Sequence, residues 1–172
     1  IMWWSIAKAE SLSNRDSRLH TRIEGRVITV FRDPKSGALS AIDSVCAHAG
    51  GNLTDGVIQD IEELNLSVVL CPLHRYMYAI SPVEMAGAKV YQALEFTTGG
   101  KPGKPKWTAT TRSASCQRSH IVTESSDGMI YIKINKSDEF FASDKDATSD
   151  VCAKQFSLHQ ELPIRQSSDF EP

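Results

Sequence analysis

The composition and charge of this chain exclude several classes of protein. Its 172 residues are 41% hydrophobic and 23% charged, which is ordinary for a soluble globular domain. A formal net charge of −2 argues against wholesale binding to nucleic acid or to a membrane surface. No apolar run approaches the roughly 18 residues that span a bilayer, and the start lacks the basic segment of a secretory signal. We therefore expect a cytoplasmic protein, or an organellar one if a transit peptide has been removed upstream of Ile1.

Short strands dominate the predicted secondary structure. β-branched, aromatic and alternating apolar residues predict strands, in chain order, at residues 3–7, 27–31, 39–45, 66–70, 76–80, 120–123 and 129–134. The dipeptide Asp127-Gly128 separates the last two and predicts a hairpin with a primed turn. One helical turn is predicted at residues 60–64 and another from Phe140 onward.

This pattern predicts an all-β fold, an antiparallel sandwich or barrel with an inserted subdomain. We expect one domain over residues 1–136, with residues 46–80 as the inserted subdomain. Residues 99–118 are rich in Gly, Pro, Ser, Thr and Lys and predict a long surface loop. Residues 137–172 are polar and acidic, which predicts a tail that is at best partly ordered.

Two short motifs indicate a metal centre. Cys46-Ala47-His48 and Cys71-Pro72-Leu73-His74 each offer one thiolate and one imidazole, and each directly follows a predicted strand. Two cysteines with two histidines form the ligand set of a Rieske [2Fe–2S] centre. We expect all four residues to bind such a cluster.

Residues beside the motifs are expected to support the cluster. Gly50 and Gly51 keep the backbone compact, so that its amides can approach the cluster sulfurs, and Pro72 stiffens the second loop.

Zinc is the sharper alternative, because two cysteines and two histidines also suit a tetrahedral zinc site. A zinc finger, however, usually pairs Cys with Cys and His with His, whereas each loop here gives one of each. The remaining histidines, His20, His120 and His159, form no oxygenase iron motif, and no nucleophile motif or phosphate loop is present. Cys116 and Cys152 are expected to be free structural thiols rather than a disulfide.

At its motif residues the chain resembles Rieske proteins, and more narrowly the small soluble Rieske ferredoxins of animals and algae. The resemblance also covers residues 50–60, Val90-Tyr91-Gln92, Lys104-Pro105-Lys106-Trp107 and residues 117–134. It implies that Cys46 and Cys71 bind one iron and that His48 and His74 bind the other. It further implies antiparallel sheets with the cluster at an exposed tip.

The chain departs from high-potential Rieske proteins of respiratory chains. Gly51 and Leu73 stand where those proteins have a disulfide beside the cluster, and Arg75 stands where oxygenase ferredoxins usually have glycine. Tyr76 replaces a serine that donates to the cluster. Tyr78 occupies the position of a tyrosine whose hydroxyl donates to a ligating cysteine, so the resemblance implies a low potential raised somewhat by Tyr78.

We therefore predict an electron carrier rather than an enzyme, a monomer that passes one electron from a reductase to an oxygenase or a similar acceptor. The alternatives are a redox-sensing regulatory module and a small subunit of a larger reductase. Five basic residues and no acid lie between positions 101 and 118, which predicts a basic docking surface for redox partners. These residues are Lys101, Lys104, Lys106, Arg112 and Arg118.

Overall fold

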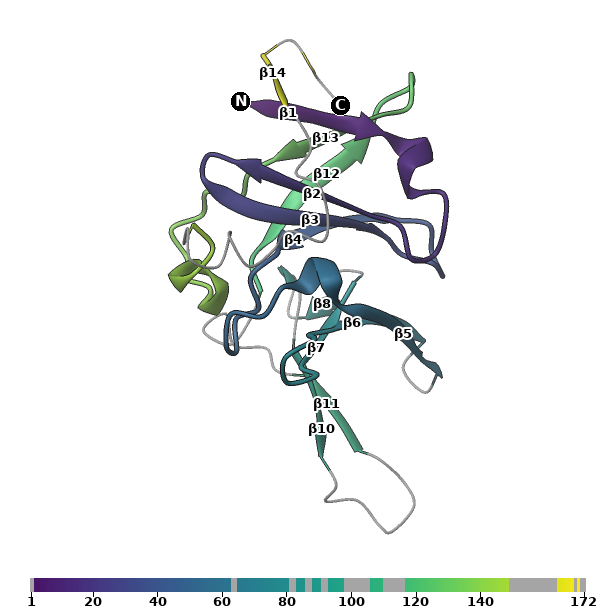
Figure 1. Ribbon diagram of the computed structural model, residues 1–172, viewed down its shortest axis with the longest axis vertical. Helices are drawn as coiled ribbons and strands as arrows, with labels where there is room; N and C mark the ends of the chain where they lie inside the picture. Colours follow the sequence, from purple (N-terminus) through teal and green to yellow (C-terminus); the bar gives the residue numbers. More distant parts are fainter. Residues whose placement is uncertain are drawn as a thin grey trace.

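Two antiparallel sheets organise the described part of the chain in the computed structural model (Figure 1). The structure describes residues 2–62, 65–80, 83–85, 88–90, 93–97, 106–109, 117–148, 164–168 and 170. Within these ranges no helix is long and apolar enough to cross a membrane. The predicted all-β fold is confirmed.

The larger sheet has seven strands and brings both ends of the chain together. Its strands, in spatial order, are β14 (Arg165–Ser167), β1 (Trp3–Lys8), β13 (Met129–Lys133), β12 (Ser119–Glu124), β4 (Leu39–Asp43), β3 (Arg26–Arg32) and β2 (Arg18–Ile23). Every neighbouring pair is antiparallel. A 3-10 turn, η1 (Ala9–Leu12), follows β1 and buries Leu12.

The smaller sheet follows β4 in the chain and lies below the larger sheet in Figure 1. Its strands, in spatial order, are β11 (Lys106–Ala109), β10 (Ala93–Thr97), β7 (Met77–Ala79), β6 (Leu66–Leu70) and β5 (Val57–Ile61). Strands β8 (Val83–Met85) and β9 (Ala88–Val90) form a separate pair, and a 3-10 turn, η2 (Leu53–Asp55), precedes β5. Pairing of β10 with β7 extends this sheet beyond residue 80, the end expected for the inserted subdomain.

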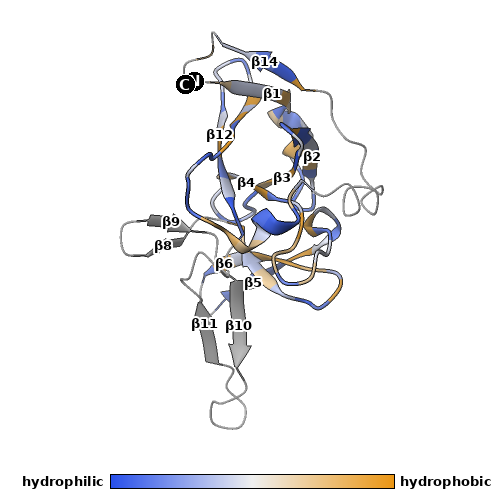
Figure 2. Ribbon diagram, turned by 90° about the vertical axis from the view of Figure 1, so that its left-hand side faces the viewer, coloured by the Kyte–Doolittle hydropathy of each residue, from blue (hydrophilic) through white to orange (hydrophobic). Residues whose placement is uncertain are grey.

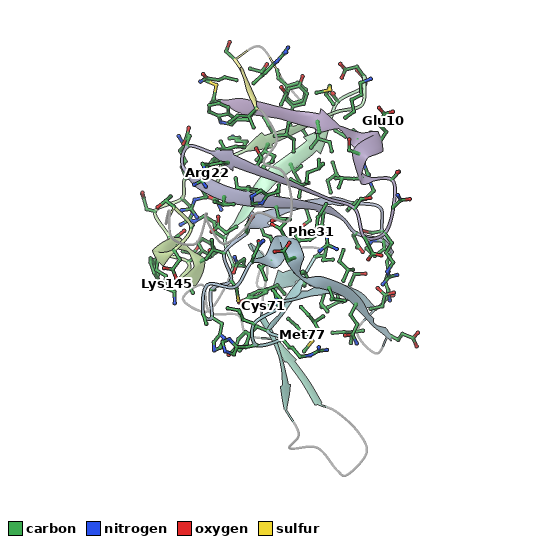
Figure 3. The ribbon with its side chains drawn as sticks, viewed as in Figure 1. Glu10, Arg22, Phe31, Cys71, Met77 and Lys145 are labelled. Carbon is green, nitrogen blue, oxygen red and sulfur yellow. The ribbon has the colours of Figure 1, made fainter. Side chains whose placement is uncertain are left out.

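A shared core joins the two sheets. Hydrophobic residues run along β3 and β6 (Figure 2), and Phe31 of β3 and Val69 of β6 are fully buried in one cluster. The same cluster contains Cys46 and Cys71. Cys71 lies below Phe31 and close to Met77 (Figure 3). The predicted metal-binding residues therefore lie where the two sheets meet.

Several local predictions were wrong. Residues 18–23 form β2, which joins β3 through Glu24 and Gly25 with φ of +50° and +82°, the signature of a primed two-residue turn. The β12–β13 hairpin forms as predicted, but only Gly128 has positive φ, because the turn closes through the Gly128 N–H and the Ser125 carbonyl. The predicted primed turn at Asp127-Gly128 is therefore absent.

The helical turn expected at residues 60–64 is only partly present, because Glu62 adopts a 3-10 conformation and its carbonyl accepts from the Asn65 N–H at 3.1 Å, whereas residues 60 and 61 are in a strand. Asp60 and Ile61 end β5 and pair with Ser67 and Leu66, because ladder hydrogen bonds outweigh weak local propensity. Residues 63 and 64 lie outside the described residues. The helical turn expected after Phe140 is present as η5 (Ala142–Lys145).

The segments expected to be loop and tail contribute to the fold where they are described. In the 99–118 segment, residues 106–109 form β11, and Gln117 and Arg118 are buried. Beyond residue 136, Phe141 and Ser143 are buried and β14 pairs with β1. Phe170 stacks on Tyr131, with the ring centroids 3.7 Å apart. The division at residue 136 stays a prediction.

Candidate functional site

The first predicted loop, residues 46–51, begins where β4 leaves the larger sheet. The Cys46 N–H donates to the Gly51 carbonyl at 2.8 Å, and the Gly50 N–H donates to the Cys46 carbonyl at 2.9 Å. Gly50 closes this loop with φ of +77°, a conformation that glycine adopts without a steric penalty. The loop therefore turns the chain back directly after Cys46.

The second predicted loop, residues 71–76, repeats this hydrogen-bond pattern after β6. The Cys71 N–H donates to the Tyr76 carbonyl at 2.8 Å, and the Arg75 N–H donates to the Cys71 carbonyl at 2.9 Å. Arg75 has φ of +60°, so it adopts the left-handed conformation that Gly50 adopts in the first loop. The replacement of glycine by Arg75 therefore leaves the loop geometry intact, although a non-glycine residue is strained there.

The two cysteine sulfurs lie together under the loops. Cys46 is 1% exposed and Cys71 is 2% exposed. The pKa of Cys46 falls to about 6, chiefly because the Cys71 thiol donates a hydrogen bond to its thiolate, while burial opposes the shift. The pKa of Cys71 is raised by that same hydrogen bond and by burial. The pair thus favours negative charge on one sulfur even before any metal is considered.

Backbone amides surround both sulfurs. The N–H groups of His48 and Ala49 donate to Cys46, and those of Leu73 and His74 donate to Cys71. Such donors stabilise a thiolate and any additional negative charge close to it.

The two predicted imidazoles lie side by side at the surface. The ring centroids of His48 and His74 are 5.0 Å apart, with 86° between the ring planes, and both residues are exposed. The ring of Tyr76 is stacked on His48. The buried sulfurs and the exposed imidazoles therefore form an inner pair and an outer pair of ligands.

Tyr78 contacts the inner pair from β7. Its hydroxyl lies 3.1 Å from the Cys46 sulfur, and its side chain is fully buried. The pKa of Tyr78 is raised, first by burial and then by the negative charge of Cys46, so the hydroxyl stays protonated and donates to the sulfur.

Glycine is required at position 51 because the two loops approach each other there. A Cβ atom at Gly51 would lie 2.5 Å from the Cys71 sulfur and 3.1 Å from Cγ of Leu73. Leu73 is 59% exposed at the tip, and Pro72 is exposed beside it.

The donors present fit a group with two metal atoms. A [2Fe–2S] group needs only two protein ligands at each iron, and its two sulfides complete the coordination. An inner sulfur pair and an outer imidazole pair meet that requirement.

Comparisons with known proteins show the family of the chain. Residues 6–137 match the family described as soluble Rieske-type ferredoxin. The chain belongs to this family. A human Rieske domain-containing protein is 30% identical to this ferredoxin over 138 residues, which are 79% of this chain and 78% of the human protein.

Solved structures share the fold of this Rieske-type ferredoxin at low sequence identity. One is a protein described as the small subunit of an NADH-dependent nitrite reductase from Mycobacterium tuberculosis, with a TM-score of 0.52 and 13% identity. The match covers 78% of this chain and 98% of that one. Another is NdmB from Pseudomonas putida CBB5, with a TM-score of 0.53 and 13% identity, covering 78% of this chain and 35% of NdmB.

The predicted basic docking surface is wrong at Arg118, and its other residues, like the two predicted free thiols, cannot be compared with the structure. Arg118 is not part of an exposed basic surface, because it is 5% exposed and its guanidinium pairs with Asp144 at 2.7 Å. The rest of that predicted surface falls at residues 101–105 and 110–116, outside the described residues, or at Lys106, whose side chain is not described. Cys116 and Cys152 also lie outside the described residues.

One residue at the site was not predicted from the sequence. Gln117 is fully buried, and its side-chain amide contacts the first loop. A glutamine directly before a strand is not distinctive, so its role was not recognisable from spacing or composition.

Proposed function

We propose that this chain is a one-electron carrier that binds a Rieske [2Fe–2S] cluster through Cys46, Cys71, His48 and His74. The observation that carries the proposal is the arrangement of two buried, adjacent sulfurs behind two exposed, adjacent imidazoles. Membership of the soluble Rieske-type ferredoxin family supports the same cofactor.

The proposed ligands have two roles: the cysteines would bind the buried side of the cofactor, and the histidines would bind its exposed side. When bound, a Rieske cluster accepts and returns one electron at a time. Cys46 and Cys71 would hold its buried side, where the Tyr78 hydroxyl and the loop amides donate to sulfur. His48 and His74 would hold its outer side, and their exposure gives a partner protein a short path to the cofactor.

We propose a carrier rather than an enzyme, because this set of residues makes or breaks no bond in a substrate. A reductase would donate the electron, and an oxygenase or a similar protein would accept it. A small subunit of a larger reductase is the second candidate, favoured by the fold shared with the nitrite reductase small subunit over 98% of that chain. A stable complex with one co-purifying protein would favour the second candidate, whereas a monomer that exchanges electrons with separate partners would favour the first.

Spectroscopy of the purified protein tests the cofactor directly. The oxidised protein should absorb in the visible range and contain about two irons and two sulfides per chain, and the dithionite-reduced protein should give a Rieske-type EPR signal. A colourless protein with one zinc per chain would reject the proposal.

Ligand variants with a matched control test the assignment of residues. Cys71→Ser should lose the visible colour and lower the Tm, because binding a metal group also contributes to folding free energy. Cys152→Ser, outside both motifs, should keep the full iron content. If Cys71→Ser keeps wild-type iron and sulfide, the ligand assignment is wrong.

A further inference from the structure

The side chain of Gln117 continues the larger sheet at the point where β4 ends. Pairing of β4 with β12 places Ser119 opposite Ile42, and the Asp43 N–H still donates to the Arg118 carbonyl at 3.0 Å. Gln117 directly precedes Arg118. From Gln117 on, the side chain rather than the backbone forms the described hydrogen bonds to the segment that follows β4.

Three hydrogen bonds of Gln117 reach the segment on either side of Cys46. Its Nε2 donates to the carbonyls of Asp43 at 2.7 Å and Val45 at 2.5 Å. Its Oε1 accepts from the Ala47 N–H at 3.0 Å. These partners are alternate residues, which present their backbone groups to the same edge of an extended chain.

The other edge of this segment is occupied by the first loop itself. The backbone N–H and carbonyl of Cys46 bond to Gly51 and Gly50, as in the loop described above. Cys46 is therefore fixed from both edges, by its own loop on one side and by Gln117 on the other. Removal of the Gln117 amide would leave the carbonyl of Val45 and the N–H of Ala47 without these partners in a buried place.

The second loop is supported in a different way. The strand that leads to Cys71 is β6, which pairs with β5 on one edge and with β7 on the other up to Leu70. A backbone ladder thus holds Leu70, the residue before Cys71, on both edges. In the described part of the chain, the Gln117 side chain gives Cys46 the support that a neighbouring strand gives the residue before Cys71.

Only glutamine has the hydrogen-bonding groups that this position uses. The position requires two N–H donors and one acceptor at the end of a side chain of this length, which a primary amide supplies. Glutamate has the same size but no N–H, so an ionised carboxylate would face the two carbonyls that Gln117 now bonds. Methionine has a similar length and makes no comparable hydrogen bond.

We propose that Gln117 is a positioning residue for the cluster: it fixes the Cys46 sulfur and, through Ala47, the backbone of His48. It acts through the first loop, because its described side-chain hydrogen bonds all go to backbone groups. This inference rests on the proposed cluster, because the feature that Gln117 positions is one half of its ligand set.

The test compares Gln117→Glu and Gln117→Met with a control variant in the core of the larger sheet. Ile132→Ala is suitable, because Ile132 is fully buried in β13 and belongs to a different core cluster. For each protein, the Tm, the EPR spectrum of the reduced form and the rate at which a chelator bleaches the visible absorbance are measured. Gln117 variants should lose the cluster about 10-fold or more faster than Ile132→Ala at a comparable loss of Tm, and their EPR spectra should broaden.

The outcomes separate this inference from the proposed function. If wild-type protein shows no Rieske spectrum, the proposed function fails before any Gln117 variant is made. If the wild type shows the spectrum, and Gln117 variants bleach no faster than Ile132→Ala and keep wild-type EPR, Gln117 supports only the fold and the inference is overturned.

Hydrogen exchange gives a measurement that does not depend on whether a variant folds. In the wild-type holoprotein the Ala47 amide should exchange as slowly as the amides of Cys46 and Gly50, which are bonded within the loop. Fast exchange at Ala47 alone would show that Gln117 does not hold the loop.

Discussion

The ring of Tyr76 lies parallel to the imidazole of His48, with the ring centroids 4.1 Å apart and 7° between the planes. Tyr76 was expected from the sequence only as the residue that replaces a hydrogen-bonding serine. The stack gives it another role, because the ring covers one face of an imidazole that is otherwise exposed. Its packing area rather than its hydroxyl is then the important property.

Two substitutions of Tyr76 should therefore distinguish the effect of its ring on the reduction potential from the effect of its hydroxyl. Tyr76→Phe keeps the stack and should leave the reduction potential within about 10 mV of wild type. Tyr76→Ala admits water beside His48. Water stabilises the reduced cluster, which is the more negative state, so the reduction potential should rise by a few tens of millivolts. Protein-film voltammetry of both variants provides the measurement. Equal shifts in the two variants would assign the effect to the hydroxyl instead.

Gly51→Ala should reduce cluster occupancy, because the new methyl group would overlap the Cys71 sulfur. The matched control is Gly37→Ala, where a Cβ meets no atom within 4 Å but φ is +72°. Both variants should lose some stability, about 1 kcal/mol from strain at Gly37, but only Gly51→Ala should lose iron and sulfide. Metal analysis after identical purification decides the outcome. Full iron content in Gly51→Ala would mean that the loops separate at little cost.

Most of the fold and the position of the two Cys-His loops could be predicted from the sequence, because both depend on short-range patterns. Runs of β-branched, aromatic and apolar residues marked β3, β6 and β13, and the paired Cys-His spacing marked both loops. Strand β2 was missed because Arg18–Ile23 is a short run with two arginines, although its polar and apolar residues alternate as in a half-buried strand. Its pairing with β3 shows that the alternation did mark a strand.

Contacts between distant segments could not be predicted in this way. Gln117 reaches Ala47 across 70 positions of the sequence, and the buried Arg118 appeared as one more charge in a basic stretch. Each of these features depends on which strands become neighbours, which a local pattern does not specify.

Arg75→Gly should keep or increase stability, in contrast to glycine substitutions in regular strands. A residue other than glycine in the left-handed region costs roughly 1–2 kcal/mol, whereas glycine adds about 0.5–1 kcal/mol of chain entropy. The expected change in unfolding free energy is therefore between none and a gain of about 1.5 kcal/mol. Lys133→Gly in β13 is the control and should lose a similar amount. Chemical denaturation of both variants measures the difference, and a clear loss in Arg75→Gly would show that the arginine side chain stabilises the loop.

Tyr78→Phe should lower the reduction potential by roughly 40 mV, the equivalent of one hydrogen bond of about 1 kcal/mol in a one-electron couple. The hydroxyl lies 3.1 Å from the Cys46 sulfur and donates more strongly as negative charge increases on the cluster side. Phenylalanine keeps the ring in the core, so the Tm and visible spectrum should change little. An unchanged potential would mean that the hydroxyl contributes only to packing.

Asp144 should make stability depend on pH in the acidic range. Burial opposes ionisation of this carboxylate, but hydrogen bonds from Arg118 and the Phe141 N–H, with the charges of Arg118 and Arg26, lower its pKa from 3.8 to about 2. Because the pKa is lower in the folded state, the stabilisation is complete above pH 4 and is lost as the pH falls from about 4 to about 2.

Asp144→Asn tests this linkage, because it removes the titrating group and keeps the size of the side chain. At pH 7 the variant should unfold with a free energy about 2 kcal/mol lower than wild type, and the difference should shrink towards pH 2. Denaturant unfolding of the metal-free forms at a series of pH values provides the measurement, since acid also releases iron. Asp138→Asn is the control, because no ion pair is described for Asp138, and at pH 7 it should unfold with nearly the wild-type free energy. A difference between Asp144→Asn and wild type that stays constant from pH 7 to pH 2 would assign the loss to packing rather than to the carboxylate charge.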